Sequence, residues 1–202
     1  MSFVARTLSA VFALAVLVLA GTSDVLACAC CAEPGYRYVK TEKFSALRSG
    51  EMVRVNFAKA AKLNVAETDE PIKGFDASTD YQVTVAWQKD DSAVFSLRDA
   101  KGRSGTLTVA RPKTLSIFEV DTRDDKDNGL GPNLYKEWKM TSPAMGDGLF
   151  KSVTGKGQTM TLVLHGRGNV CPDAKQFTAW TLLVYGDAGT FTLTGKLDAM
   201  EP

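Results

Sequence analysis

Apolar and polar residues alternate with a period of two along much of this chain, and this alternation is what most constrains its fold. The pattern recurs in residues 53–57, 81–88, 106–109, 159–164 and 190–194, and threonine is frequent at the polar positions. A period of two places apolar side chains on one face of a β-strand and polar side chains on the other. The sequence therefore predicts antiparallel strands with one buried and one solvated face.

Short loops that contain Gly or Asp separate the alternating segments, as at residues 89–91, 99–103 and 186–189. Loops of this kind indicate hairpins. Residues 177–185 are apolar on both faces and predict a central strand. Consecutive hairpins must close or stack to hide their edges. The expected fold is all-β, as an antiparallel up-and-down β-barrel or a two-sheet sandwich, and we favour the barrel.

Helix is expected at only two places in the chain. Residues 42–47 predict one or two helical turns that end before Gly50. Leu134 and Trp138 lie four residues apart, and this spacing indicates a short helix over residues 133–138. The fold class is therefore not expected to include a helical layer.

A chain of this length with this up-and-down pattern resembles a lipocalin-type barrel in general architecture. Lipocalins begin with a Gly-x-Trp motif, and the nearest stretch of this chain, residues 34–38, does not fit it. The resemblance therefore implies a barrel with an interior and carries over no functional residue.

The N-terminus has the features of a secretory signal peptide. Arg6 supplies the positive charge, residues 8–20 form an apolar stretch too short to span a membrane comfortably, and residues 25–27 fit a cleavage site before Cys28. We therefore expect an exported protein of the periplasm or cell envelope.

Cleavage before Cys28 divides the chain into three expected parts. They are a signal peptide (1–27), an N-terminal segment with cysteines (28–50) and an antiparallel β-barrel domain (51–202). The chain has a formal net charge of +1, which argues against nucleic acid as a partner. It also lacks a recognisable catalytic set, so we expect no enzymatic activity and no confident cofactor.

The four cysteines predict a disulfide bond in an oxidising compartment. Cys28, Cys30 and Cys31 are clustered just after the leader, whereas Cys171 lies far along the chain. A bond from Cys30 or Cys31 to Cys171 would close a long loop and stabilise the fold by about 4–5 kcal/mol in the chain-entropy model.

Two alternatives use the same cysteines differently. Clustered thiolates bind soft metals, so Cys28, Cys30, Cys31 and Cys171 with His165 could hold copper. Residues 25–28 also resemble a lipobox, in which Cys28 would carry a lipid that tethers a structural lipoprotein to the membrane.

Aromatic residues suggest a cavity inside the barrel. Trp87, Phe95, Trp180 and Tyr185 are candidates to line it, although such residues also form ordinary cores. The function expected from the sequence is therefore non-catalytic binding of a small apolar ligand by an exported β-barrel, with its N-terminal cysteines linked to Cys171.

Overall fold

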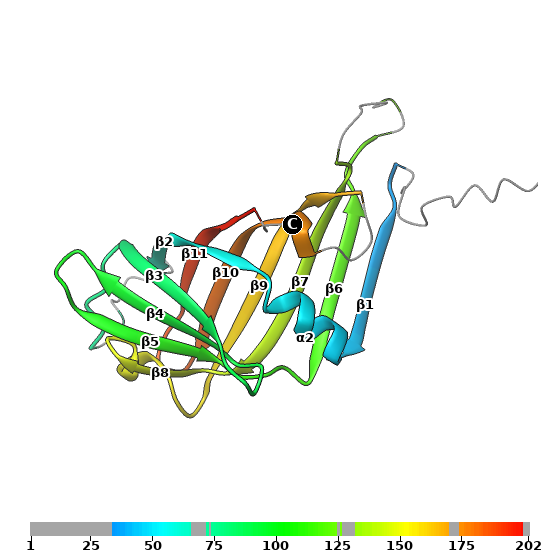
Figure 1. Ribbon diagram of the computed structural model, residues 1–202. Helices are drawn as coiled ribbons and strands as arrows, with labels where there is room; N and C mark the ends of the chain where they lie inside the picture. The colour runs from blue at the N-terminus through cyan, green and yellow to red at the C-terminus, as the bar shows by residue number, and fades with distance from the viewer. Residues whose placement is uncertain are drawn as a thin grey trace, which may run out of the picture. The chain divides into compact units, whose positions relative to one another are not determined.

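The computed structural model describes residues 34–65, 72, 74–124, 126, 132–169 and 174–199. They form one antiparallel sheet of 11 strands that curls into a half-barrel, with a single α-helix (Figure 1). The strands are β1 (Arg37–Lys43), β2 (Asn56–Val65), β3 (Asp80–Trp87), β4 (Ala93–Asp99), β5 (Ser104–Val109), β6 (Thr114–Asp121), β7 (Leu134–Pro143), β8 (Met145–Gly148), β9 (Gln158–Gly168), β10 (Phe177–Gly186) and β11 (Phe191–Asp198).

The expected all-β, antiparallel, barrel-like class is confirmed, but the strand order is not a simple up-and-down meander. The sheet order is β1-β6-β7-β9-β10-β11-β2-β3-β4-β5-β8. Strands adjacent in sequence pair from β2 to β5 and from β9 to β11, whereas β2 pairs with the last strand, β11. The N-terminal strand β1 lies at one edge beside β6.

A bend between β7 and β8 brings one end of the sheet, β8, next to β7, which is the third strand from the other end. Only Ala144 separates these strands, yet β7 pairs with β6 and β9 while β8 pairs with β5 at the far end of the sheet order. The Ala144 amide also bonds to the Gln158 carbonyl at 2.9 Å. This short connection explains why the sheet curls instead of lying open.

The interior of the half-barrel is filled by apolar side chains from alternate positions of the strands. Phe95 and Trp180 are fully buried, and their ring centroids lie 5.3 Å apart. Phe57 packs on both rings, at 5.4 Å from Phe95 and 5.7 Å from Trp180. Aromatic rings at such distances contribute about 0.5–1.5 kcal/mol per pair beyond their burial.

The helix α2 (Ala46–Met52) connects β1 to β2 and packs beside the interior. The Ser45 hydroxyl caps it by accepting a hydrogen bond from the Arg48 amide. Ser49 donates a hydrogen bond to Asp91 in the β3–β4 hairpin, which ties the helix to that hairpin. No helix in the described part of the chain is long and apolar enough to cross a bilayer.

Both sequence-predicted helices are corrected by the structure. Residues 42–47 include the end of β1, and the helix begins only at Ala46, after its Ser45 cap. Residues 134–138 belong to β7, so the helix expected there is wrong. Spacing of four residues also places two side chains on the same face of a strand, which is the arrangement that Leu134 and Trp138 adopt.

Candidate functional site

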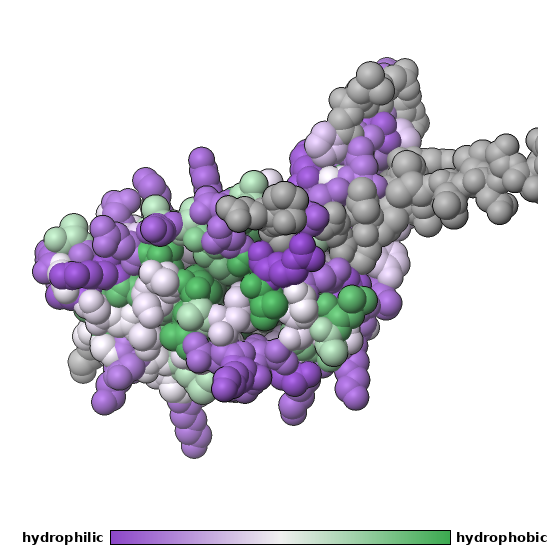
Figure 2. All heavy atoms as spheres, viewed as in Figure 1, coloured by the Kyte–Doolittle hydropathy of each residue, from purple (hydrophilic) through white to green (hydrophobic). Residues whose placement is uncertain are grey.

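The strands β2 and β3 pair over only three positions, and a groove lies at this seam. The paired positions are Ala60 with Gln82, Ala61 with Tyr81 and Lys62 with Asp80. Toward the start of β2 the two strands part, because β2 continues toward α2 while β3 continues into its hairpin with β4 (Figure 1). In the view of Figure 1, apolar side chains gather in the middle of the half-barrel, and polar side chains surround them (Figure 2).

Small residues make the groove. Its volume is about 920 Å³, within the range of small-molecule sites. On β2, Phe57 and Ala61 face the core, so the alternation turns Ala58, Ala60 and Lys62 outward. Six of the 14 lining residues are Ala or Gly, and this leaves the space unfilled: Ala58, Ala60, Ala61, Ala100, Gly102 and Gly195.

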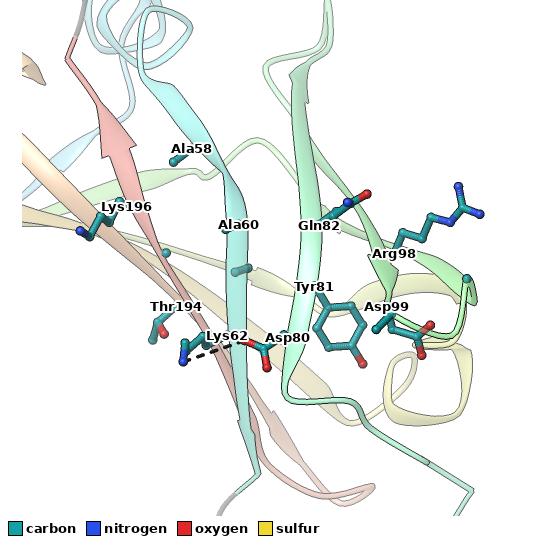
Figure 3. A pocket seen from close by; sticks show the side chains of 14 residues that line it. Ala58, Ala60, Lys62, Asp80, Tyr81, Gln82, Arg98, Asp99, Thr194 and Lys196 are labelled. Carbon is teal, nitrogen blue, oxygen red and sulfur yellow. Dashed lines mark ion pairs between the residues drawn. The ribbon is translucent and has the colours of Figure 1, made fainter.

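Charged side chains stand at the border of this alanine floor (Figure 3). Lys196 extends from β11 on one side, and Arg98 from β4 on the other. Lys62 and Asp80 form an ion pair of 3.9 Å at one end, with side chains that are 77% and 70% exposed. Such an exposed and long pair adds little free energy, so both side chains can rearrange around a ligand.

Asp99 also lines the groove, but its carboxylate is already hydrogen-bonded to other residues of the protein. Its carboxylate accepts hydrogen bonds from the Arg103 Nε at 2.7 Å, the Arg103 amide at 2.9 Å and the Ser78 hydroxyl at 3.1 Å. Burial alone would raise the pKa of this carboxyl, yet these hydrogen bonds keep it below its ordinary value. Asp99 therefore stays ionised and neutralises Arg103 instead of the cations at the groove.

The indole of Trp180 lies directly behind the groove. A side chain at Gly195, one of the lining residues, would place its Cβ only 2.5 Å from the Trp180 Nε1. This nitrogen is buried and has no hydrogen-bond partner among the described residues. The glycine thus allows the indole to pack closely against β11, near the floor of the groove.

The structure brings together only some of the aromatic residues expected to line a cavity. Phe95 and Trp180 meet in the core, and Trp87 is partly buried against it. Tyr185 lies on the outer face, 39% exposed, because an odd spacing along β10 places it opposite Trp180. The interior that these rings occupy is packed, and the groove of Figure 3 lies on the other side of the sheet.

The predicted disulfide and metal residues are described only in part. Cys28, Cys30, Cys31 and Cys171 lie outside the described residues, so the disulfide, copper and lipid hypotheses remain predictions. His165 faces outward from β9, and its Nε2 lies 3.3 Å from the Thr181 hydroxyl. In the described part of the chain, no three His, Cys, Asp or Glu side chains are grouped as metal ligands would be.

The surroundings of His165 are an outer-face network on β7. Glu137 is paired with His165 across the β7–β9 ladder and accepts a hydrogen bond from the Tyr135 hydroxyl at 2.6 Å. Burial, then the Glu137 carboxylate, raises the pKa of Tyr135 to about 12. Burial lowers the pKa of His165, and Glu137 opposes this only in part. His165 is therefore mostly neutral at pH 7, with its Nε2 within hydrogen-bond distance of the Thr181 hydroxyl.

A second polar cluster is buried inside the half-barrel, beneath the short turn η2 (Ala174–Gln176). The Lys136 side chain is 1% exposed, and its Nζ donates to the Gln176 Oε1 at 2.7 Å. Gly168 makes room for this glutamine, since a Cβ there would overlap it. Because buried charges are costly unless they are bonded, the cluster fixes η2 against the sheet.

Comparison with known proteins identifies no relative of this chain: no family model, curated protein sequence or solved structure matches it. The candidate site therefore depends on the geometry described above.

The residues of the groove were not singled out by the sequence. One signal was present, because residues 58–61 read Ala-Lys-Ala-Ala within a strand. Alanine is depleted in strands, where branched and aromatic side chains pack better. An alanine run on the outer face of a strand is thus the pattern that could have indicated the groove.

Proposed function

We propose that this protein is an exported, non-catalytic binding protein of the cell envelope that takes a small apolar ligand into the groove at the β2–β3 seam. The observation that carries the proposal is the groove of about 920 Å³ over the β2–β3 seam, whose lining includes the residues of the three paired positions and the small residues beside them. Ligand sites are concave, largely apolar and bordered by a few polar groups. The groove has each of these properties.

Catalysis receives no support from the titratable groups at this groove. Asp99 is bonded to Arg103 and Ser78, and Lys62 is paired with Asp80. No nucleophile with an adjacent base lines the groove within the described residues. Binding is therefore the function that these side chains support best.

Titration with the uncharged fluorophore N-phenyl-1-naphthylamine tests the proposal. We expect saturable binding to the wild-type protein and a loss of affinity of at least about tenfold in Ala60→Phe, because the new ring fills the floor of the groove. Ala86→Phe is the matched control, since Ala86 is an exposed outward alanine on β3 that does not line the groove.

Two outcomes would overturn the proposal. One is the absence of saturable binding to the wild-type protein. The other is an affinity that Ala60→Phe leaves unchanged, or that Ala86→Phe lowers equally, because either result would place the bound fluorophore elsewhere.

The proposal also includes export and a disulfide from Cys30 or Cys31 to Cys171, as the leader and the cysteine spacing suggest. The intact mass of the native protein, with and without reductant, tests both. We expect the mass of a chain that begins at Cys28 and gains two hydrogens per bridge on reduction. A mass that includes the leader contradicts export, whereas an added lipid or copper ion would favour the lipoprotein or the copper protein.

A further inference from the structure

The border of the groove carries more positive than negative charge. Lys62, Lys196 and Arg98 line it together with the carboxylates of Asp80 and Asp99. Asp99 pairs with Arg103 at 2.7 Å, Arg103 also pairs with Asp76 at 2.6 Å, and Asp76 lies 3.8 Å from Lys101, so these charges balance one another and Asp99 does not balance the cations of the groove. Asp80 faces Lys62 at 3.9 Å. Two cations at the groove, Lys196 and Arg98, therefore remain without an ion pair among the described residues.

These two cations lie on opposite sides of the floor. Lys196 projects from the outer face of β11, and Arg98 from the outer face of β4 (Figure 3). The guanidinium of Arg98 reaches the β4–β5 turn, where its Nη2 would lie 3.6 Å from a Cβ at Gly102. Both side chains are long and exposed, so their charged ends can turn toward a ligand while their methylene stems cover it.

Between the cations, Ala58 and Ala60 offer only methyl groups, whereas Gln82, which is paired with Ala60 on one side and Arg98 on the other, adds an amide, and Thr194 adds a hydroxyl. Ala58 and Ala60 supply no side-chain hydrogen bond, so the part of the ligand that lies on them must be apolar. A ligand that satisfies both the floor and the border has an apolar chain and one anionic end. The whole chain carries a net charge of only +1, so this preference is local to the groove.

From this charge complementarity, and resting on the proposed function, we infer that the ligand is a free single-chain amphiphile with an anionic end, a carboxylate or a phosphate. The apolar chain lies along Ala58 and Ala60, and the anion pairs with Lys196, Arg98 or both. Lys62 supplies a further cation once the exposed ion pair with Asp80 opens.

Displacement of N-phenyl-1-naphthylamine by four 12-carbon compounds below their micelle concentrations tests the inference. We expect dodecanoate and dodecyl phosphate to displace it at concentrations at least about tenfold lower than dodecanol, and dodecyltrimethylammonium to be the weakest. The difference between dodecanoate and dodecanol should shrink as salt rises, because exposed charges are screened.

A double variant assigns the preference to the two cations. Lys196→Met with Arg98→Met should retain binding of the fluorophore and of dodecanol but lose the preference for the acids. Lys89→Met with Lys113→Met is the matched control, because it removes the same charge from exposed positions away from the groove and should keep that preference.

The outcomes separate the inference from the proposed function. If the fluorophore does not bind, the proposed function fails. If it binds but dodecanol competes as well as dodecanoate, the function stands and the inference is wrong. The inference is also wrong if both double variants lose the preference equally, or if vesicles of anionic phospholipid bind while the free acids do not.

Discussion

A side chain added at Gly195 would meet close neighbours, whereas one added at Gly50 would point into open space. A Cβ at Gly195 would lie 2.5 Å from the Trp180 indole, whereas nothing lies within 4 Å of one at Gly50 in α2. We expect Gly195→Ala to lower the free energy of unfolding by about 1–3 kcal/mol through overpacking. We expect Gly50→Ala to raise it by about 0.5–1 kcal/mol, because alanine favours a helix.

Urea denaturation at pH 7.5 measures both changes. Because the two substitutions add the same methyl group, their opposite signs distinguish close packing at Gly195 from a general effect of alanine. Equal stability of Gly195→Ala and the wild-type protein would show that the indole does not lie behind β11, and would remove Trp180 from the description of the groove.

At the scale of the strands, the seam between β2 and β3 predicts uneven protection of backbone amides. Residues 83–87 of β3 pair with β4 on one side, but the ladder to β2 covers only residues 80–82. Residues 180–184 of β10 pair on both sides, with β9 and β11. Backbone groups without a partner strand open more readily.

Hydrogen–deuterium exchange followed by peptide mass spectrometry checks this difference. We expect about half of the amides in residues 83–87 to exchange more than about tenfold faster than those in residues 180–184. A tenfold ratio corresponds to a difference of about 1.4 kcal/mol in the free energy of opening. Equal protection of the two segments would mean that β2 and β3 stay paired along their length in solution, and the short ladder between them would be wrong.

Strands with one apolar face were predictable from the sequence, and strands with a buried charge were not. The alternation in residues 81–87 and 159–164 correctly predicted β3 and β9. In β6, Glu119 takes an inward position, and in β7 Lys136 does, so the apolar period is interrupted there. The buried Lys136 bonds to Gln176, which lies in a distant segment, and no local pattern reveals such a partner.

The edge strand β1 was not predicted, because it has too few buried residues to show an alternation. Nearly all of its residues are exposed on both faces, so it lacks a buried stripe that would produce an alternation. The helix predicted over residues 42–47 began too early. Ser45 caps a helix whose first residue is Ala46, and the prediction did not take this cap into account. The alanine run marked the position of the groove, but its shape was not predictable, because residues from β11, β2, β3 and β4 line it and the β11–β2 pairing is long-range.

At the scale of the whole molecule, the carboxyl groups predict a loss of stability in acid. Six of them have folded-state pKa values below their ordinary range because of bonded cations, hydroxyls or amides: Glu42, Asp76, Asp90, Asp99, Asp121 and Glu137. A lowered folded pKa stabilises the fold above the unfolded value and loses this contribution as the pH falls. We therefore expect a steep loss of stability below about pH 4.

His165 contributes a second and smaller loss of stability, which occurs at a higher pH than the loss from the carboxyl groups. Burial lowers its pKa below 6.5, so the unfolded chain binds the proton more readily than the fold does, and stability falls as the pH drops through that value. The groups that face it across the neighbouring strands are Glu137 on β7 and Thr181 on β10. Only Glu137 is charged, and its attraction for the protonated ring keeps the step small.

Urea midpoints at pH 7.5, 5.5 and 3.5 separate the two steps. The wild-type protein should be slightly less stable at pH 5.5 than at 7.5 and much less stable at 3.5. His165→Gln should have equal midpoints at pH 7.5 and 5.5 and should keep the loss at 3.5, because the glutamine does not titrate and the carboxyl network is intact. If His165→Gln declines between pH 7.5 and 5.5 as the wild-type protein does, another group titrates in that range, and the half-buried position of His165 on the outer face does not control it.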